Sequence, residues 1–158
     1  MTRVVRIDNR MTKWDKRFLE IATNISTWSK DRSTKVGCVI VGPHSEIRSV
    51  GYNGFPRGVD DNIDSRHERP IKYKWTEHAE RNAIFNAVLS GITLHDCTLY
   101  NTWYPCADCA RAIIQTGIRT VVCGKAPDNS NPTYIEDFKV THAMFSEVGI
   151  TVILPEVV

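Results

Sequence analysis

The sequence lacks a long apolar run. No stretch of its 158 residues approaches the roughly 18 consecutive apolar residues that a membrane-spanning helix needs. The N-terminal segment Met-Thr-Arg-Val-Val-Arg-Ile-Asp contains no apolar core of the kind that secretory signals carry. These two absences predict a cytoplasmic protein with no membrane partner.

An excess of one charge sign is missing as well. The chain holds 20 Lys and Arg residues against 18 Asp and Glu residues, which gives a formal net charge of +2. Binding to duplex nucleic acid usually requires a basic face, so we expect no duplex partner. A small phosphate-bearing ligand needs only one or two local charges and stays compatible with this balance.

Cysteines are few, and their number, five, is odd. Without an export signal, this count argues against a disulfide framework and for a reducing compartment. Cys38, Cys97 and Cys123 each lie in apolar, strand-like runs that are typical of a protein core. Cys106 and Cys109 instead form a C-x-x-C motif, which requires a chemical explanation.

Repeats, low-complexity tracts and Pro/Gly/Ser-rich linkers are absent, so residues 1–158 are predicted to form one domain. Hydrophobic spacing predicts helices over 13–29, 77–90, 107–116 and 135–148, and strands over 36–41, 47–52, 97–102, 119–123 and 150–154. The first two strands are expected to form a hairpin, and the strand–helix–strand order after residue 97 predicts parallel neighbours. The predicted fold is α/β, a three-layer α/β/α sandwich around a five-stranded mixed sheet.

The strongest chemical signal is a possible metal site made by two motifs. His78 and Glu80 form H-x-E, and a P-C-x-x-C motif contains Cys106 and Cys109. Both motifs lie at predicted helix starts, where free N–H groups and the helix dipole favour thiolates. Two thiolates and one imidazole leave one tetrahedral position of a zinc ion open, as in catalytic zinc sites, with Glu80 as a base beside the metal.

Two other interpretations of the C-x-x-C motif are open. A redox dithiol is expected near an N-terminal βαβ unit, which this motif does not follow. A closed structural zinc site requires a fourth Cys or His at regular spacing. Residues 59–77 contain His67 and no cysteine, so we expect one zinc ion per chain.

H-x-E followed by P-C-x-x-C is the signature of the zinc-dependent nucleobase and nucleotide deaminases. The chain resembles this family from about residue 14 to 154, and most of all its deoxycytidylate (dCMP) deaminase group. The narrower resemblance rests on residues 34–41 (T-K-V-G-C-V-I-V), 51–58 (G-Y-N-G-F-P-R-G) and 78–84 (H-A-E-R-N-A-I). It implies a cytidine deaminase-like fold, hydrolysis of the amidine C–N bond of dCMP to give dUMP and ammonia, and a hexamer.

The resemblance also implies a role for each motif residue. A zinc ion held by His78, Cys106 and Cys109 would activate water, and Glu80 would carry protons from it to the pyrimidine and the leaving amine. The backbone N–H of Ala79 would bind the pyrimidine carbonyl.

The residues that bind the rest of the substrate are less sharply defined. Asn53 matches an Asn that contacts the sugar in related deaminases, although an Asn before a glycine is also common in simple turns. Tyr134 is the first candidate for stacking on the pyrimidine, with Trp103 and Tyr104 as alternatives. The candidates for binding the phosphate are Lys35, Arg32 and Asn82.

The polar connection over residues 53–75 is long for a compact domain, which is typical of functional loops. The resemblance implies that its start carries an allosteric nucleotide site, activated by dCTP and inhibited by dTTP. Glycine lets the backbone approach phosphates, an arginine pairs with them, and an acidic residue can hold a bridging Mg²⁺ ion. The candidate effector residues are Gly54, Phe55, Arg57, Gly58, Asp60 and Asp61.

Two other functions stay open. The first is a base deaminase that acts on tRNA or single-stranded DNA, which the near-neutral charge and the segment 51–58 disfavour. The second is a zinc-binding module without catalysis, which the presence of Glu80 beside an open metal position disfavours.

Overall fold

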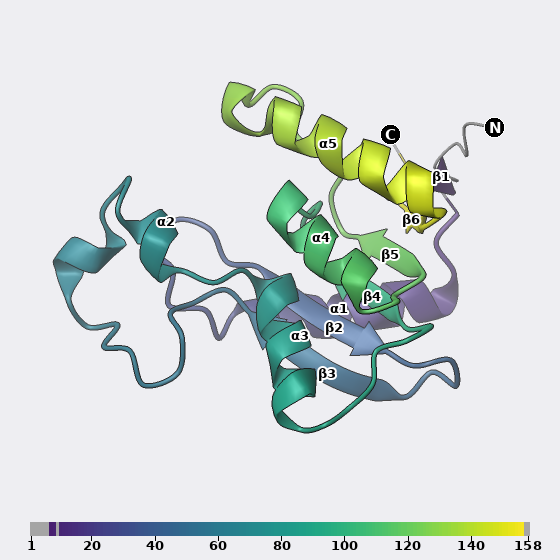
Figure 1. The fold of residues 1–158 in the computed structure, drawn as a ribbon, viewed down its shortest axis with the longest axis horizontal. Coiled ribbons are helices and arrows are strands. Elements are labelled where there is room, and N and C mark those ends of the chain that lie inside the picture. Colours follow the sequence, from purple (N-terminus) through teal and green to yellow (C-terminus); the bar gives the residue numbers. More distant parts are fainter. Residues whose placement is uncertain (1–6, 9, 157–158) are drawn as a thin grey trace.

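The computed structural model describes residues 7–8 and 10–156 (Figure 1). The helices are α1 (Lys13–Ser26), α2 (Lys72–Trp75), α3 (Ala79–Leu89), α4 (Ala107–Gln115) and α5 (Pro132–Val148), with a 3₁₀ turn η1 (Asp64–His67). The strands are β1 (Ile7–Asp8), β2 (Gly37–Val41), β3 (Ile47–Tyr52), β4 (Thr98–Asn101), β5 (Thr120–Cys123) and β6 (Thr151–Ile153).

The sheet contains the five predicted strands in the order β6-β5-β4-β2-β3. Strands β4, β5 and β6 are parallel, whereas β2 is antiparallel to both β3 and β4, so the mixed sheet is confirmed. A sixth strand, β1, pairs in parallel with β6 at the far edge. Its two residues are too few to produce a periodic hydrophobic signal, so the sequence did not predict it.

Helices cover both faces of this sheet, which confirms the three-layer sandwich (Figure 1). Strand β2 is buried along its whole length, and its side chains alternate between two cores. Cys38 and Ile40 join the core under α3, α4 and α5, while Val39 and Val41 join the core under α1. In the described part of the chain, no helix combines the length and the apolar character that crossing a bilayer requires.

A capping box starts α1. The Asp15 N–H donates to Thr12 Oγ1 (3.1 Å), and the Thr12 N–H donates back to Asp15 Oδ2 (2.8 Å). Such a cap stabilises a helix by about 1 kcal/mol. The other oxygen of Asp15 accepts a hydrogen bond from the Tyr100 hydroxyl (3.0 Å), which ties the helix start to β4.

The first helix, α1, is shorter than predicted: it ends at Ser26 and not at residue 29. The Ser29 hydroxyl donates to the Asn53 carbonyl (2.7 Å), which directs the chain away from the helix axis. Trp28 therefore leaves the apolar stripe of the helix and is 56% exposed.

Two glycines bring helices close to the sheet. A Cβ atom on Gly37 would lie 1.9 Å from the Ala22 carbonyl oxygen of α1. One on Gly51 would lie 2.3 Å from the Ala83 nitrogen of α3. The close approach at Gly51 sets the height of α3 over the sheet, and with it the position of the residues at the start of α3.

The connection between β3 and α3 is partly regular, since it contains η1 and α2. An ion pair joins it to the loop before β2, with Lys72 Nζ 3.0 Å from Asp31 Oδ2 and both side chains almost fully buried. Burial by itself would raise the pKa of Asp31, but the N–H groups of Thr34 and Ser33 and the Lys72 ammonium lower it to about 2. The carboxylate therefore stays ionised and holds the connection against the body of the protein.

The two ends of this connection lie side by side. The Glu77 N–H donates to the Gly54 carbonyl (2.8 Å), and the Gly54 N–H donates to the Glu77 carbonyl (3.1 Å). The chain thus returns to the end of β3 immediately before His78.

Candidate active site and metal centre

The two motifs meet at the starts of α3 and α4. His78 is the N-cap of α3, Cys106 is the N-cap of α4, and Cys109 lies in the first turn of α4. The Ala107 N–H at the start of α4 donates to Asp137 Oδ2 of α5 (2.7 Å), which anchors this helix end. The sequence predicted both helix starts to within two residues, and the fold brings them together.

The three side chains have the geometry of a zinc site. His78 Nδ1 lies 3.3 Å from Cys106 Sγ and 3.4 Å from Cys109 Sγ, and all three ligand atoms lie within 4.8 Å of one another. A tetrahedral zinc ion with ordinary Zn–S and Zn–N bonds separates nitrogen and sulfur ligands by about 3.6 Å. The donor set and its spacing therefore fit Zn²⁺ with one coordination position open.

Exposure decreases across this cluster, from His78 at the surface through Cys106 to the buried Cys109. A hydrogen bond from the Cys109 thiol, with one from His78, lowers the pKa of Cys106 to about 5. The same thiol–thiol hydrogen bond, together with burial, raises the pKa of Cys109. One thiolate is thus stable without metal, and a bound dication would deprotonate the second thiol.

Glu80 lies next to the cluster and is only 4% exposed. His78 has extended backbone angles, so the usual helical rotation of 100° per residue does not separate the directions of His78 and Glu80. A side-chain hydrogen bond with Cys109 places the Glu80 carboxyl at the cluster. Burial raises the pKa of Glu80 to about 7, although nearby His78 counteracts this shift. A carboxyl group with a pKa near neutrality suits general acid–base catalysis.

Asn101, at the end of β4, is the site residue that sequence reasoning missed. Its side-chain Nδ2 donates to Glu80 Oε1 (2.8 Å), and the residue is fully buried. The available signal was an Asn, a residue that is depleted in strands, within the predicted strand over 97–102.

Tyr134 lies in the first turn of α5, not in the preceding loop as predicted. Its ring is 37% exposed and stacks on Phe138 (5.9 Å between centroids), which packs edge-on against Tyr104. Burial, and then the charges of Tyr73 and Cys106, raise the pKa of Tyr134. Trp103 is also 37% exposed and lies beneath the Lys125 ammonium.

Asn53 and Ala79 are both buried. Asn53 Nδ2 donates to the Thr34 carbonyl (2.8 Å), and its Oδ1 accepts from the Val36 N–H (2.8 Å), so it joins the end of β3 to the segment before β2. Ala79 is the first residue of α3, where a backbone N–H has no partner within the helix.

The three phosphate candidates differ in their surroundings. Lys35 is exposed. Arg32 forms an ion pair with Asp64 (2.6 Å), and Asn82 donates to the Tyr52 carbonyl (2.8 Å).

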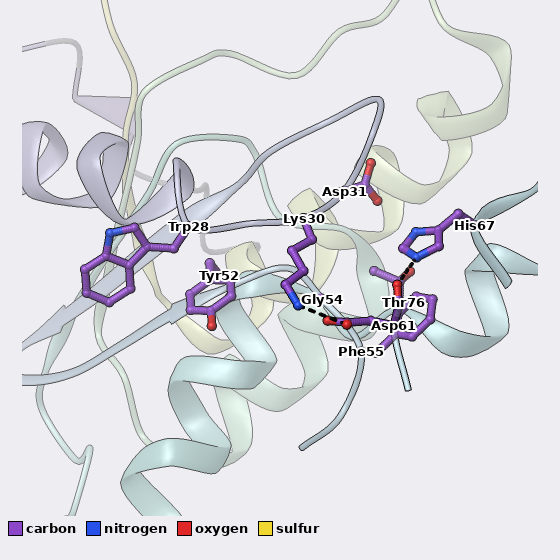
Figure 2. Close-up of a pocket in the computed structure, with 9 residues that line it drawn as sticks. All are labelled: Trp28, Lys30, Asp31, Tyr52, Gly54, Phe55, Asp61, His67 and Thr76. Atoms are coloured by element: carbon purple, nitrogen blue, oxygen red, sulfur yellow. Dashed lines mark hydrogen bonds and ion pairs between the residues drawn. The ribbon is translucent and has the colours of Figure 1, made fainter. Parts of the chain in front are cut away.

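A cavity of about 150 Å³ lies between the end of α1, the end of β3 and the connection that follows (Figure 2). Three of the predicted effector residues, Gly54, Phe55 and Asp61, line this effector cavity. Lys30 Nζ lies 3.0 Å from Asp61 Oδ1, and the Phe55 ring stacks on His67 (4.8 Å). Sequence reasoning did not assign Lys30 or His67, because only tertiary packing brings them to this place.

The other three effector candidates lie outside the cavity lining. The Arg57 guanidinium donates to Asn86 of α3. Gly58 has a positive φ of 78° in a turn, and Asp60 accepts from the Asn62 N–H (2.9 Å).

Comparison with known proteins defines the family. The family model for the cytidine and deoxycytidylate deaminase zinc-binding region matches residues 12–125. An uncharacterized deaminase in the luxG 3′ region of Aliivibrio fischeri is 44% identical over 142 residues, covering 90% of this chain and 93% of that protein. A probable deoxycytidylate deaminase of Caenorhabditis elegans is 48% identical over 112 residues, covering 69% of this chain and 56% of that protein.

The fold of this chain is also similar to that of a solved dCMP deaminase. The dCMP deaminase of cyanophage S-TIM5, solved in complex with dCMP and dUMP, superposes with a TM-score of 0.70 at 24% identity, covering 90% of this chain and 98% of that one. The chain therefore belongs to the zinc-dependent cytidine and deoxycytidylate deaminase family, and it is a deaminase of the cytidine deaminase-like fold.

Proposed function

We propose that this protein hydrolyses dCMP to dUMP and ammonia. The observation that carries the proposal is the buried Glu80 carboxyl beside the His78–Cys106–Cys109 cluster. The probable deoxycytidylate deaminase of C. elegans supports a nucleotide substrate, because its identity of 48% to this chain is high.

In this proposal His78, Cys106 and Cys109 would hold a single zinc ion, which would supply an activated water for attack at C4 of cytosine. Glu80 accepts a proton from the water and delivers it to N3. Glu80 then takes the remaining proton from the new hydroxyl on C4 and gives it to the 4-amino group, which leaves as ammonia while C4 becomes a carbonyl. The Ala79 N–H holds the pyrimidine carbonyl.

Three further side chains position the nucleotide in this proposal. Tyr134 stacks on the ring, since its partly exposed side chain packs through Phe138 against Tyr104, directly before the P-C-x-x-C motif. Lys35 offers an exposed cation for the phosphate, and Asn53 orders the sugar side of the site.

A substrate panel tests the activity. We expect ammonia release and the ultraviolet change of cytosine deamination with dCMP, at a kcat/KM at least about 100-fold above that with deoxycytidine, CMP, dCTP or single-stranded DNA. Equal or better turnover of single-stranded DNA or tRNA, with a steep salt dependence, would favour the polynucleotide deaminase. A zinc-loaded protein that releases no ammonia from any cytosine compound would instead be a binding module.

We also propose that the effector cavity binds deoxynucleoside triphosphates with Mg²⁺, so that dTTP inhibits and dCTP activates. Lys30 offers a cation at the cavity, Asp61 a carboxylate for the magnesium ion, and Phe55 an aromatic surface. Arg57 would have to leave Asn86 to reach a phosphate in the same cavity.

Inhibition by dTTP with Mg²⁺ is expected to weaken in Lys30→Ala. Loss of a charge-assisted hydrogen bond to phosphate raises the half-inhibiting concentration by at least about 10-fold. Arg57→Glu should weaken it as well if the arginine joins the site. Lys139→Ala is the matched control, because Lys139 is as exposed as Lys30 and also forms an ion pair, with Glu136 on α5. A wild-type protein whose dCMP turnover responds to neither dTTP nor dCTP would contradict the regulatory proposal.

Finally, we propose a homo-oligomer, a hexamer as the family resemblance implies, acting in the cytoplasm. Exposed apolar side chains on α3, including Phe85, Val88 and Leu89, support an interface on that helix. All five cysteines are free, which fits a reducing compartment.

A further inference from the structure

We propose that Asn101 is a positioning residue for the catalytic carboxylate, and that its amide holds Glu80 in the orientation that the reaction needs. This inference deepens the proposed function and rests on it for the role of Glu80. Asn101 is the last residue of β4, in the middle of the sheet, and none of its surface is exposed.

Two acceptors determine how the amide lies. Asn101 Nδ2 donates one hydrogen to Glu80 Oε1 (2.8 Å) and the other to the Trp103 carbonyl oxygen (2.9 Å). With the amide turned over, Oδ1 would face two oxygen acceptors and both bonds would be lost. The amide hydrogens are therefore committed, one to the carboxylate and one to the backbone.

Stability does not account for an asparagine at this position. Its Oδ1 is buried and has no hydrogen-bond partner among the described residues, which is unfavourable for folding. Its register partners on the neighbouring strands are Cys38 and Cys123, which are fully buried members of the apolar core. These strand neighbours would accept an apolar side chain, so what the asparagine adds is its pair of hydrogen bonds to Glu80 and Trp103, which points to a functional constraint.

The hydrogen bond gives the carboxylate a rigid support. A glutamate side chain rotates about three bonds, and burial alone does not select one orientation. Anchoring Oε1 to the sheet fixes the plane of the carboxylate, so that the proton transfers use a defined geometry. Because the second bond goes to Trp103, the same amide also holds the segment that leads into Cys106. It therefore fixes the position of the Glu80 carboxylate relative to the cysteine ligands.

Asn101→Leu tests this role, since leucine has a similar shape and no amide. We expect kcat for dCMP to fall about 10- to 100-fold while KM stays within about 2-fold, because only the geometry of the chemical step changes. Zinc content should stay at one per chain, so that the fall in kcat reports the orientation of the carboxylate and not loss of metal. A kcat within 2-fold of wild type would overturn the proposal.

Thr141→Val is the matched control. Thr141 is equally buried, and its hydroxyl donates to the Pro105 carbonyl (3.2 Å), next to the same cysteine motif but without a bond to Glu80. This variant loses one buried hydrogen bond and Asn101→Leu loses two, but only Asn101→Leu removes the bond to Glu80. An unchanged kcat in Thr141→Val would therefore separate positioning of Glu80 from general damage to the region. An equal fall in kcat in both variants would overturn the assignment to Asn101.

A second measurement needs no substrate. The side-chain amide signals of Asn101 in a ¹H–¹⁵N spectrum should be protected from exchange, and Glu80→Gln should shift them while leaving those of exposed amides in place. Signals that do not respond to Glu80→Gln would overturn the contact whatever the substrate is. A clear shift in a protein that fails to deaminate dCMP would leave the contact standing and reject the proposed function instead.

Discussion

Glu80→Gln is expected to lower kcat for dCMP by at least about 10³-fold, with zinc content unchanged. General acid–base catalysis typically contributes 10²–10⁴-fold, and here one carboxyl group performs both proton transfers. Glutamine keeps the volume and the polar contact with Asn101 but cannot take up or release a proton. Steady-state kinetics with zinc analysis on the same preparation measures both quantities.

Glu147→Gln is the control for this result, because Glu147 is an exposed residue of α5 that receives the same substitution. Near wild-type turnover in a zinc-loaded Glu80→Gln protein would remove Glu80 from the mechanism. An inactive Glu80→Gln protein without zinc would mean that the substitution disturbs the metal ligands instead.

Cys109→Ala should abolish turnover for a different reason, namely loss of the metal. Cys109 is the most buried of the three ligands, and without its sulfur only two side chains hold the ion. We expect zinc affinity to fall by more than about 100-fold, since loss of groups that merely support a ligand already costs 10–100-fold. Chelation of wild-type zinc should have the same effect on turnover and should be reversed by added Zn²⁺.

Cys97→Ala is the matched control, because Cys97 is also fully buried but lies in the core and not in the ligand cluster. It should destabilise the protein without changing zinc content. Metal analysis after dialysis and thermal unfolding with and without chelator measure these outcomes, since a ligand bound only to the folded state raises Tm. Full zinc occupancy in Cys109→Ala would refute the three-ligand site.

Local signals in the sequence were sufficient for most regular elements. The strand over 47–52 and the start of the helix at Ala107 agree with β3 and α4 to the residue. The hydrophobic spacing predicts that the last helix starts at residue 135, three residues late, and so it predicts Tyr134 in a loop. In the structure Asn131 caps α5 and Pro132 begins it. The connection over 53–75 carries no periodic apolar pattern, so η1 and α2 within it had no signal to predict them.

What the sequence by itself determined are the parts of the site that depend on neighbours along the chain. Each motif keeps its functional groups within four residues at a helix start, so local geometry is enough to present His78 with Glu80, and Cys106 with Cys109. Contacts between distant segments depend on strand order and helix packing, which no local pattern encodes. Only the tertiary structure therefore brought the two motifs within 3.4 Å, set the Asn101 amide against Glu80 and placed Lys30 beside Asp61.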